Sequence, residues 1–263
     1  MEKLIHAIGL PEEAEQSAVQ YDLPASDYMV WKELFDSDPE RFLQTWREET
    51  DWRERALPLY LRLALDAYPA YRKKEIPKSV YIDTFRDIAI WCLDCHQKTG
   101  IWGIMDIWWL MQSVKLRIFR LGRLQFEKMV LPEKLSENLT EGMDVLQVHI
   151  PAGEPLLPEA CDASFAAAKQ FYNLEHGCFV CDSWLMEPKL SMLLEDNSHI
   201  MQFQRRFQIA RVHAPFPQAE QRIFGQILED KNSYPEHTSL QKKAKQYLLA
   251  GGQLEIGIGY ILF

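Results

Sequence analysis

The segment formed by residues 144–185 constrains the fold more than any other part of the chain. It predicts a buried strand at 144–150, a proline-rich loop, a helix that begins at Pro158 and a second strand at 178–185. A strand, a helix and a strand at this spacing form a βαβ unit, in which the two strands are parallel and the crossover is right-handed. The chain is therefore expected to contain a sheet with at least one parallel pair of strands.

Secondary structure can be predicted on both sides of this unit as well. Residues 116–130 change from helical to alternating periodicity, which predicts one strand or a pair of strands that turns near Gly122. The motif Thr-Ser-Leu-Gln at 238–241 is a capping box and predicts the start of a helix. Two more strands are expected at 206–213 and 254–262, so the sheet has several strands with helices between them.

The first 75 residues differ from the rest, because their apolar residues recur only at helical spacing. Prolines divide this stretch into several short helices, and Pro58 suits the first turn of one of them. We therefore expect a small all-helical N-terminal domain at 1–75. The remainder, 76–263, is expected to form an α/β (or α+β) domain with a mixed sheet flanked by helices.

Charge and cysteine content narrow the functional classes. The chain has 38 acidic and 29 basic residues and a net charge of −9, which disfavours binding to nucleic acid. Its five cysteines are odd in number and sparse, as in proteins of a reducing compartment rather than in disulfide-stabilised ones. No stretch approaches the roughly 18 consecutive apolar residues of a membrane span. We expect a soluble, cytoplasmic protein that binds neither nucleic acid nor membranes.

Several longer segments carry a resemblance to a known family: RLGRLQFE at 120–127, VHIPAGEPL at 148–156, EACDASFAAAKQFY at 159–172, FVCDSWLMEPKL at 179–190 and TSLQKKAKQYLLAGGQLEIGIGYI at 238–261. They resemble bacterial acyltransferase-domain proteins with a C-terminal domain like that of the general N-acetyltransferases (GNAT). The resemblance covers about 75–263, and a weaker similarity extends to the helical N-acyltransferase N-terminal domain of that family. It implies a GNAT-like fold and direct transfer of an acyl group from acyl-CoA to the amine of a small-molecule or peptide acceptor.

The loop at 151–158 is where GNAT enzymes hold the pyrophosphate of coenzyme A, on backbone N–H groups of a glycine-rich sequence. Here the loop reads Pro-Ala-Gly-Glu-Pro-Leu-Leu-Pro, and its prolines have no N–H to donate. Only one glycine permits close approach of the backbone. The resemblance therefore implies that the coenzyme binds to this segment together with nearby basic side chains, through Ile150, Ala152, Gly153, Arg120 and Arg123. The same basic residues are also compatible with a solvated strand face.

Two side chains near the end of the first parallel strand are candidate catalytic bases. His149 ends this strand, where ligands of open sheets bind, and imidazole groups can accept a proton near neutral pH. Glu127 lies where GNAT enzymes often place a carboxylate. Each residue also has a structural interpretation, because His149 could be a hydrogen-bonded core histidine and Glu127 a partner of a nearby arginine.

The second parallel strand ends with Asp182 and Ser183, which would face the same cleft as His149 if the two strands are neighbours. Asp182 could orient His149 or act as the base, and Ser183 could bind pantetheine or protonate the leaving thiolate. Both residues are equally suited to cap a following helix. A hydrolase that uses Cys181 or Ser183 as its nucleophile is a further hypothesis.

Two Cys-x-x-Cys motifs, Cys92 to Cys95 and Cys178 to Cys181, have the local spacing of zinc ligands. The first lies on an amphipathic helix, and the second lies on a strand, where residues three apart point to opposite faces. We therefore expect core cysteines and no metal. The alternative to an acyltransferase is a non-catalytic GNAT-like module that binds a small molecule or a protein, which the proline-rich loop favours.

Overall fold

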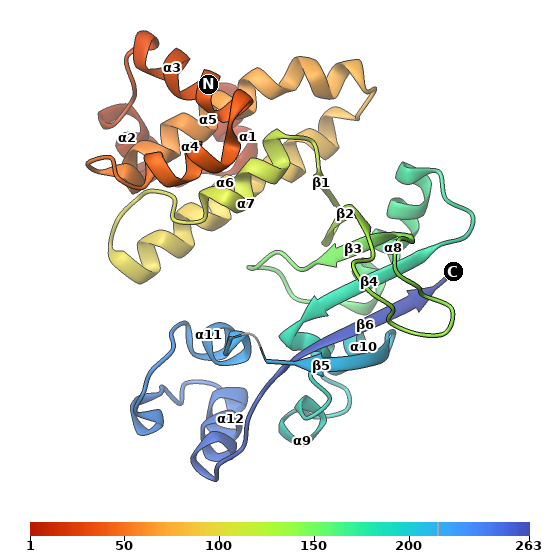
Figure 1. Ribbon diagram of the computed structural model, residues 1–263. Coiled ribbons are helices and arrows are strands. Elements are labelled where there is room, and N and C mark those ends of the chain that lie inside the picture. Colours follow the sequence, from red (N-terminus) through yellow and green to blue (C-terminus); the bar gives the residue numbers. More distant parts are fainter. Residues whose placement is uncertain (215) are drawn as a thin grey trace. The chain divides into compact units, whose positions relative to one another are not determined.

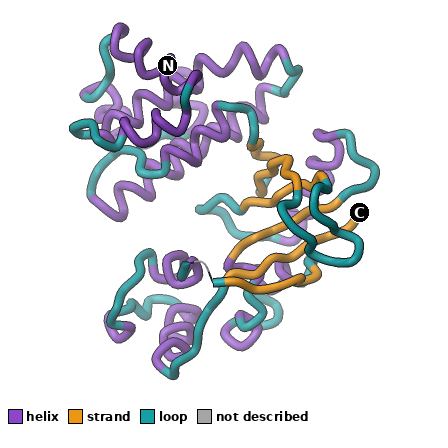
Figure 2. The backbone as a smooth tube through the Cα atoms, in the orientation of Figure 1, coloured by secondary structure: helices purple, strands orange, loops and turns teal. Residues whose placement is uncertain are grey.

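A computed structural model describes residues 1–214 and 216–263. The chain forms two compact units, of which the first comprises residues 1–121 with 151–153 and the second comprises 122–150 with 154–263 (Figure 1). Helices dominate the first unit, and the strands of the second form a sheet (Figure 2). The mixed α/β fold class that the sequence predicts is confirmed. The described part of the chain contains no helix that is both long and apolar enough to cross a membrane.

The first unit consists of seven helices and one short strand among its described residues, which are α1 (Glu2–Ile8), α2 (Glu12–Gln20), α3 (Ala25–Ser37), α4 (Pro39–Trp46), α5 (Trp52–Lys73), α6 (Lys78–Thr99), α7 (Ile107–Val114) and β1 (Ile118–Leu121). Two of the helices begin with an aspartate cap. Asp38 accepts a hydrogen bond from the backbone N–H of Arg41, and Asp106 accepts one from Trp109. The boundary expected between residues 75 and 76 falls between α5 and α6, inside this unit.

Helix α5 corrects one prediction, because Pro58 lies inside the helix rather than in its first turn, and Pro69 lies inside it as well. Proline is disfavoured in the interior of a helix, because it has no N–H to donate and the helix loses one backbone hydrogen bond. The middle of α5 is buried on several sides by residues such as Leu57, Tyr60 and Leu61. Tertiary packing therefore outweighs the local preference to break the helix.

Buried tyrosines connect the helices of the first unit. The hydroxyl of Tyr60 donates to the carbonyl of Ile107 at 2.5 Å, and that of Tyr71 donates to Ser113 at 2.8 Å. Tyr81 donates to a carbonyl of α5 at 2.9 Å, and burial raises its pKa to about 12. Each hydroxyl satisfies a polar group that burial would otherwise leave without a hydrogen bond.

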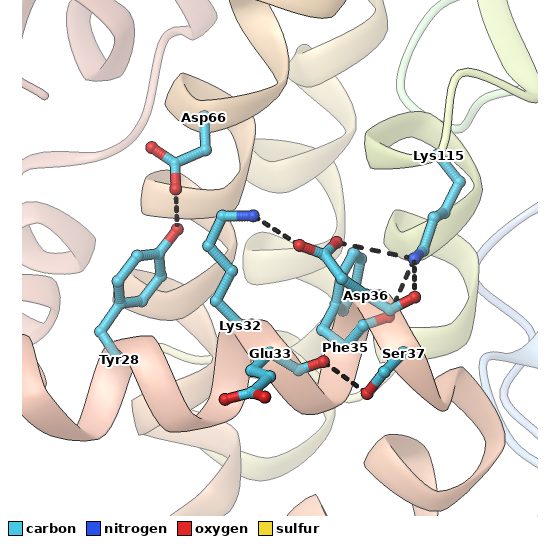
Figure 3. Close-up of polar contacts among 8 residues, drawn as sticks. All are labelled: Tyr28, Lys32, Glu33, Phe35, Asp36, Ser37, Asp66 and Lys115. Atoms are coloured by element: carbon cyan, nitrogen blue, oxygen red, sulfur yellow. Dashed lines mark hydrogen bonds and ion pairs between the residues drawn. The ribbon is translucent and has the colours of Figure 1, made fainter.

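A lysine near the end of α7 joins that segment to the C-terminus of α3 (Figure 3). The ammonium group of Lys115 donates to the carbonyl of Phe35 at 2.8 Å and lies 3.7 Å from the carboxylate of Asp36. A cation at this place is favourable because the carbonyls at a helix C-terminus carry partial negative charge. Burial nevertheless lowers the pKa of Lys115. On α3 as well, the hydroxyl of Tyr28 donates to the carboxylate of Asp66 at 2.7 Å.

The second unit contains the remaining elements, in which η denotes a short 3₁₀ helix. They are β2 (Leu124–Val130), β3 (Asp144–His149), α8 (Pro158–Tyr172), β4 (Cys178–Ser183), η1 (Trp184–Met186), α9 (Leu190–Leu193), α10 (His199–Gln204), β5 (Gln208–His213), α11 (Gln218–Phe224), η2 (Lys231–Ser233), α12 (Ser239–Leu249) and β6 (Ile256–Leu262). Its strands run in the order β2-β3-β4-β6-β5. Strands β3 and β4 are parallel, whereas β2 with β3, β4 with β6 and β6 with β5 are antiparallel. The predicted βαβ unit is confirmed as β3, α8 and β4.

The two faces of this sheet have different surroundings. The back face packs on α8 through aromatic rings, with Phe165 of the helix 4.8 Å from Phe179 of β4 and 6.1 Å from Phe126 of β2. The front face carries the opposite residues of the same strands, and part of it is buried under the segment 131–143 by a cluster made of Leu131, Leu139, Val145, Cys178, Val180, Ile258 and Tyr260. Residues on both faces of the sheet therefore contribute to the core, on the front face only in part.

Two glycines of β6 allow a close approach of the chain that follows β4. A Cβ atom on Gly257 would lie 2.1 Å from the carbonyl oxygen of Met186 in η1. The backbone of η1 is itself fixed, because the amide of Gln204 donates to the carbonyls of Leu185 and Glu187 at 2.8 and 2.9 Å. Glycine is therefore required at position 257 by space rather than by backbone conformation.

Candidate functional site

The parallel strands β3 and β4 define the region in which the sequence places its catalytic candidates. Leu146 pairs with Phe179, and Gln147 pairs with Val180. Among the described residues, β3 and β4 are paired no further than Gln147 and Val180. Strand β3 nevertheless continues to His149 and β4 to Ser183. The carboxyl ends of two parallel neighbours therefore lie side by side, where ligands of open α/β sheets bind.

His149 and Glu127 form the first pair of ionisable side chains at this site. In the antiparallel register of β2 and β3, Glu127 is opposite Gln147, and Gln125 is opposite His149. Both side chains consequently point to the front face. The Nε2 atom of His149 lies 3.4 Å from a carboxylate oxygen of Glu127, and the two side chains are 20% and 24% exposed. The imidazole is thus partly accessible to solvent and has a carboxylate beside it.

Asp182 and His213 form a second pair, which the sequence did not reveal. An Oδ1 atom of Asp182 lies 2.8 Å from Nε2 of His213, and the side chains are 35% and 34% exposed. Asp182 is opposite Ile258 of β6, and His213 is opposite Ile256, so the contact crosses β6 diagonally. The structure thus places the Asp182 carboxylate against His213 of β5. A role of Asp182 in orienting His149, or as the base itself, stays a prediction.

Ser183 has a structural contact of its own. Its hydroxyl accepts a hydrogen bond from the backbone N–H of Leu185 at 3.2 Å and so caps η1. It alternates with Asp182 along β4 and therefore belongs to the back face of the sheet. The capping contact that the sequence allowed for this residue is present.

Cys181 is also on the back face and is completely buried. Burial raises the pKa of the Cys181 thiol well above its usual range. A nucleophilic cysteine needs a lowered pKa and access to its substrate. Since His149 points to the opposite face, Cys181 does not have the arrangement of a catalytic nucleophile, and the hydrolase hypothesis that uses it is wrong.

Arg123 is buried and holds the loop that follows β3. Its guanidinium donates to the carbonyl of Pro155 at 3.1 Å and to that of Glu154 at 2.5 Å. Arg120 is also buried, and its backbone N–H donates to Thr84 of α6 at 3.0 Å. The interpretation of these two arginines as a solvated strand face is therefore wrong. Whether they contact a phosphate remains a prediction.

The loop that follows β3 exposes some of its residues. Ile150 is half-buried, and Ala152 and Gly153 are exposed. Gly153 has a positive φ of 98°, which favours glycine, and a Cβ atom built there would meet no neighbour within 4 Å. Contacts of these three residues with coenzyme A remain predicted.

The N-terminus of α8 carries a second arginine that the sequence did not single out. Arg206 donates to the carbonyl of Pro158 at 3.0 Å and to the carboxylate of Asp162 at 2.9 Å. The positive charges of Arg206 and Arg123 both act on Cys161 in the first turns of α8. The same turns carry the acids Glu159 and Asp162, and the Asp162 carboxylate pairs with Arg206, so the charge at this helix N-terminus is mixed. The only hint in the sequence was the Arg-Arg pair before β5.

Comparisons with known proteins show the family and the fold of the chain. The model of an N-acyltransferase N-terminal domain matches residues 1–116, and that of a GNAT-like C-terminal domain matches residues 118–261. A search of the curated proteins found no match. Among solved structures, the chain is similar to an acyltransferase in complex with decanoyl-CoA and teicoplanin, at 20% identity and a TM-score of 0.80, over 99% of this chain and 87% of that one.

Two further solved structures have the same fold. An acyltransferase in complex with CoA and 10C-teicoplanin is 20% identical, with a TM-score of 0.81, over 99% of this chain and 86% of that one. An acyltransferase in complex with decanoyl-CoA is 22% identical, with a TM-score of 0.80 and the same coverage. The resemblance inferred from the sequence is confirmed. The model of the GNAT-like C-terminal domain matches more than half of the residues of this chain. The chain therefore belongs to the family of proteins with a GNAT-like C-terminal domain, here preceded by an N-acyltransferase N-terminal domain.

Proposed function

We propose that this protein is an acyl-CoA-dependent N-acyltransferase, which transfers an acyl group directly from the thioester to an amine. The observation that carries the proposal is the His149–Glu127 pair, which lies on the front face where β3 and β4 cease to pair. A proton acceptor at this place is what attack by an amine requires. Membership of an acyltransferase family supplies the reaction class.

The strands β3 and β4 would bind the pantetheine arm of the donor. Beyond Gln147, the peptide groups of β3 that face β4 can exchange hydrogen bonds with the two amides of pantetheine. This mode of binding resembles the addition of a strand to a sheet. Main-chain N–H groups in the same stretch would also stabilise the oxyanion that develops when the amine attacks the thioester. Ile150 continues this strand and would extend the contact.

The phosphates of the donor would lie beyond β3, near the N-terminus of α8. Arg123 and Arg206 would supply positive charge there, with the Asp162 carboxylate already paired to Arg206. The residues fit an anion, although Pro158 occupies the first position of α8 and donates no N–H. Compared with a glycine-rich loop, side chains would therefore contribute more of the binding than backbone groups.

The acceptor would be an amine of a small molecule or a peptide. An amine arrives as an ammonium ion, and His149 would take its proton while Glu127 stabilises the resulting imidazolium. The carboxylates of Glu127 and Asp182 on the front face would attract the cation. Five free, buried cysteines support a reducing compartment such as the cytoplasm.

The proposal can be tested by calorimetric titration with decanoyl-CoA, acetyl-CoA and coenzyme A, followed by an amine screen that measures release of free thiol. We expect saturable donor binding and turnover with at least one amine. The variants H149Q and E127Q should keep donor affinity and lose at least about a hundredfold in kcat. The exposed His176 provides a matched control, H176Q, that should behave as the wild type.

A non-catalytic binding module is the competing function, and the prolines of the loop at 151–158 favour it. Absence of binding to all three coenzyme species would reject the acyltransferase and leave this alternative. Donor binding without turnover of any amine, and without an effect of H149Q, would also contradict the proposed chemistry.

A further inference from the structure

Four basic residues gather where α5 and α6 of the first unit meet. Arg72 and Lys73 belong to the last turn of α5, Lys74 follows it directly, and Lys78 is the first residue of α6. Between them the chain has one acid, Glu75, so this turn carries a net charge of +3 in a chain whose net charge is −9. All five side chains are exposed. Figure 1 shows the turn at the end of the hairpin of α5 and α6, away from α2, α3 and α4.

The charge of this turn is not neutralised by the rest of the described chain. Within residues 1–214 and 216–263, none of the four cations has an ion pair or a side-chain hydrogen bond. The next carboxylates along the two helices are already engaged, because Asp66 accepts a hydrogen bond from Tyr28 and Asp83 lies 3.4 Å from Arg86. Basic residues elsewhere in the unit do have carboxylate partners, namely Lys32, Arg55, Arg62, Arg86 and Lys98.

The dipoles of the two helices explain only part of this arrangement. Basic residues at the C-terminus of α5 are favourable, since the last carbonyls of a helix carry partial negative charge. The opposite holds for α6, whose first turn contains no acid and begins with Lys78. Its N-cap, Pro77, makes no side-chain hydrogen bond with the helix. The turn therefore lacks the negative charge that its cations and this helix end both favour.

The surface beside two of these cations is hollowed. Tyr68, Pro69, Arg72 and Lys73 line the hollow, which has a volume of about 370 Å³. They share one side of α5, because residues four apart on a helix are neighbours. The ring of Tyr68 packs against that of Tyr81 in α6, with 4.8 Å between the ring centroids. Sites for small molecules have volumes of about 300–1,000 Å³, so a small ligand fits this hollow.

A phosphate group is the anion that these side chains suit best. A guanidinium binds two phosphate oxygens through parallel hydrogen bonds, and an ammonium adds a compact charge. The ring of Tyr68 offers an apolar surface to the organic part of such a ligand. A long nucleic acid is a poor fit, because the rest of the chain is strongly acidic and repels a polyanion.

We propose that the hollow at the end of α5 binds a phosphate-bearing ligand. Arg72 and Lys73 contact the phosphate, Tyr68 contacts the organic part, and the charges of Lys74 and Lys78 add to the attraction. A soluble organic phosphate and the phosphate headgroup of a lipid present this chemistry alike, and separate probes distinguish them. The inference goes beyond the proposed acyl transfer, because none of these residues belongs to the candidate site of the second unit.

Calorimetric titration with inorganic pyrophosphate, at low and at moderate salt, measures the affinity of the hollow. The variant R72Q/K73Q removes the two cations that line it. The matched control R41Q/K242Q removes the same charge from two exposed residues that have no ion pair in the described part of the chain. We expect saturable binding to the wild type and the control, and binding at least about tenfold weaker to R72Q/K73Q.

Spectra of ¹⁵N-labelled protein show where the pyrophosphate binds. The amide signals of residues 68–80 should shift in the wild type and stay unchanged in R72Q/K73Q. Shifts confined to residues 150–162 would support the proposed donor site and would overturn the second site. Failure of the protein to turn over any acyl-CoA would reject the proposed function and leave the shifts at 68–80 as they are.

Vesicles separate the two sources of phosphate. Cosedimentation with phosphatidylglycerol vesicles that R72Q/K73Q abolishes would assign the hollow to a lipid headgroup, with phosphatidylcholine vesicles as the control without net charge. Binding of pyrophosphate without cosedimentation would assign it to a soluble phosphate. If neither probe binds, or if R72Q/K73Q binds both as tightly as the wild type does, the proposal is overturned.

Discussion

Replacing Gly257 with alanine should destabilise the second unit through a single steric contact. The added Cβ would lie 2.1 Å from the carbonyl oxygen of Met186 and 2.4 Å from its carbonyl carbon. Real Cβ contacts are essentially never shorter than 3.0 Å, so β6 or η1 must retreat by roughly 1 Å. The atoms in the way belong to the backbone, and Gln204 fixes that backbone with two hydrogen bonds.

The expected magnitude is a balance of two effects. Overpacking costs about 1–3 kcal/mol, and a backbone obstacle places Gly257→Ala at the upper end, about 3 kcal/mol. Alanine also leaves the unfolded chain less flexible than glycine does, which stabilises the folded state by about 0.5–1 kcal/mol. The net cost of about 2 kcal/mol corresponds to a fall of about 4–8 °C in the melting temperature of the second unit. Differential scanning calorimetry would measure this fall.

Gly259→Ala is a matched control, because it lies on the same strand and the same face. Its Cβ would lie 2.9 Å from the Cβ of Phe207, 3.0 Å from the sulfur of Met186 and 3.2 Å from Cδ1 of Ile209, so the neighbours need to move by only about 0.1 Å. A methionine side chain can move at little cost. We expect Gly259→Ala to cost less than about 1 kcal/mol. A Gly257→Ala protein as stable as the wild type, or more stable than Gly259→Ala, would refute the argument from backbone contact.

Three further predictions follow from burial. All five cysteines are free and buried, so none should react rapidly with Ellman's reagent in the native protein, whereas all should react in guanidinium. A single thiol that reacts rapidly in the native protein would contradict this prediction. Arg123→Gln should lower stability by about 1–3 kcal/mol in urea unfolding, since it removes the charged hydrogen bonds from the buried arginine to the partly buried carbonyls of Glu154 and Pro155. Unchanged stability would argue against this role. The pKa of Tyr81 rises from 10.0 to about 12 on folding, so its contribution is complete below pH 10 and is lost as the pH rises through 12. Urea unfolding of Tyr81→Phe across this range should show a smaller loss than the wild type.

Local patterns were sufficient to predict the elements that carry the site. The strand that ends at His149, the helix that opens at Pro158 and the following strand each have their own periodicity and boundaries. The capping box at Thr238 and Gln241 is present as predicted. These signals act over a few residues, so no knowledge of the tertiary structure was needed to read them.

The contacts of the candidate site could not be predicted in the same way. His213 contacts Asp182 because β6 separates their strands by one position, and no local signal specifies that order. Arg123 is a cation in the sequence, but its role in holding loop carbonyls depends on burial. Helix α8 ends at Asn173 in a left-handed conformation, although Gly177, four residues later, is an equally suitable residue type for a helix end.

Strand order also determines when the second unit can form during translation. β6 lies between β4 and β5 in the sheet, yet residues 256–262 are the last strand to leave the ribosome. Until then β4 and β5 lack their shared neighbour, and their hydrogen-bonding edges remain open. The first unit is almost contiguous within residues 1–121 and can fold earlier. A nascent chain therefore carries a folded helical unit and an unfinished sheet, and the unfinished sheet is the part that chaperones would have to protect.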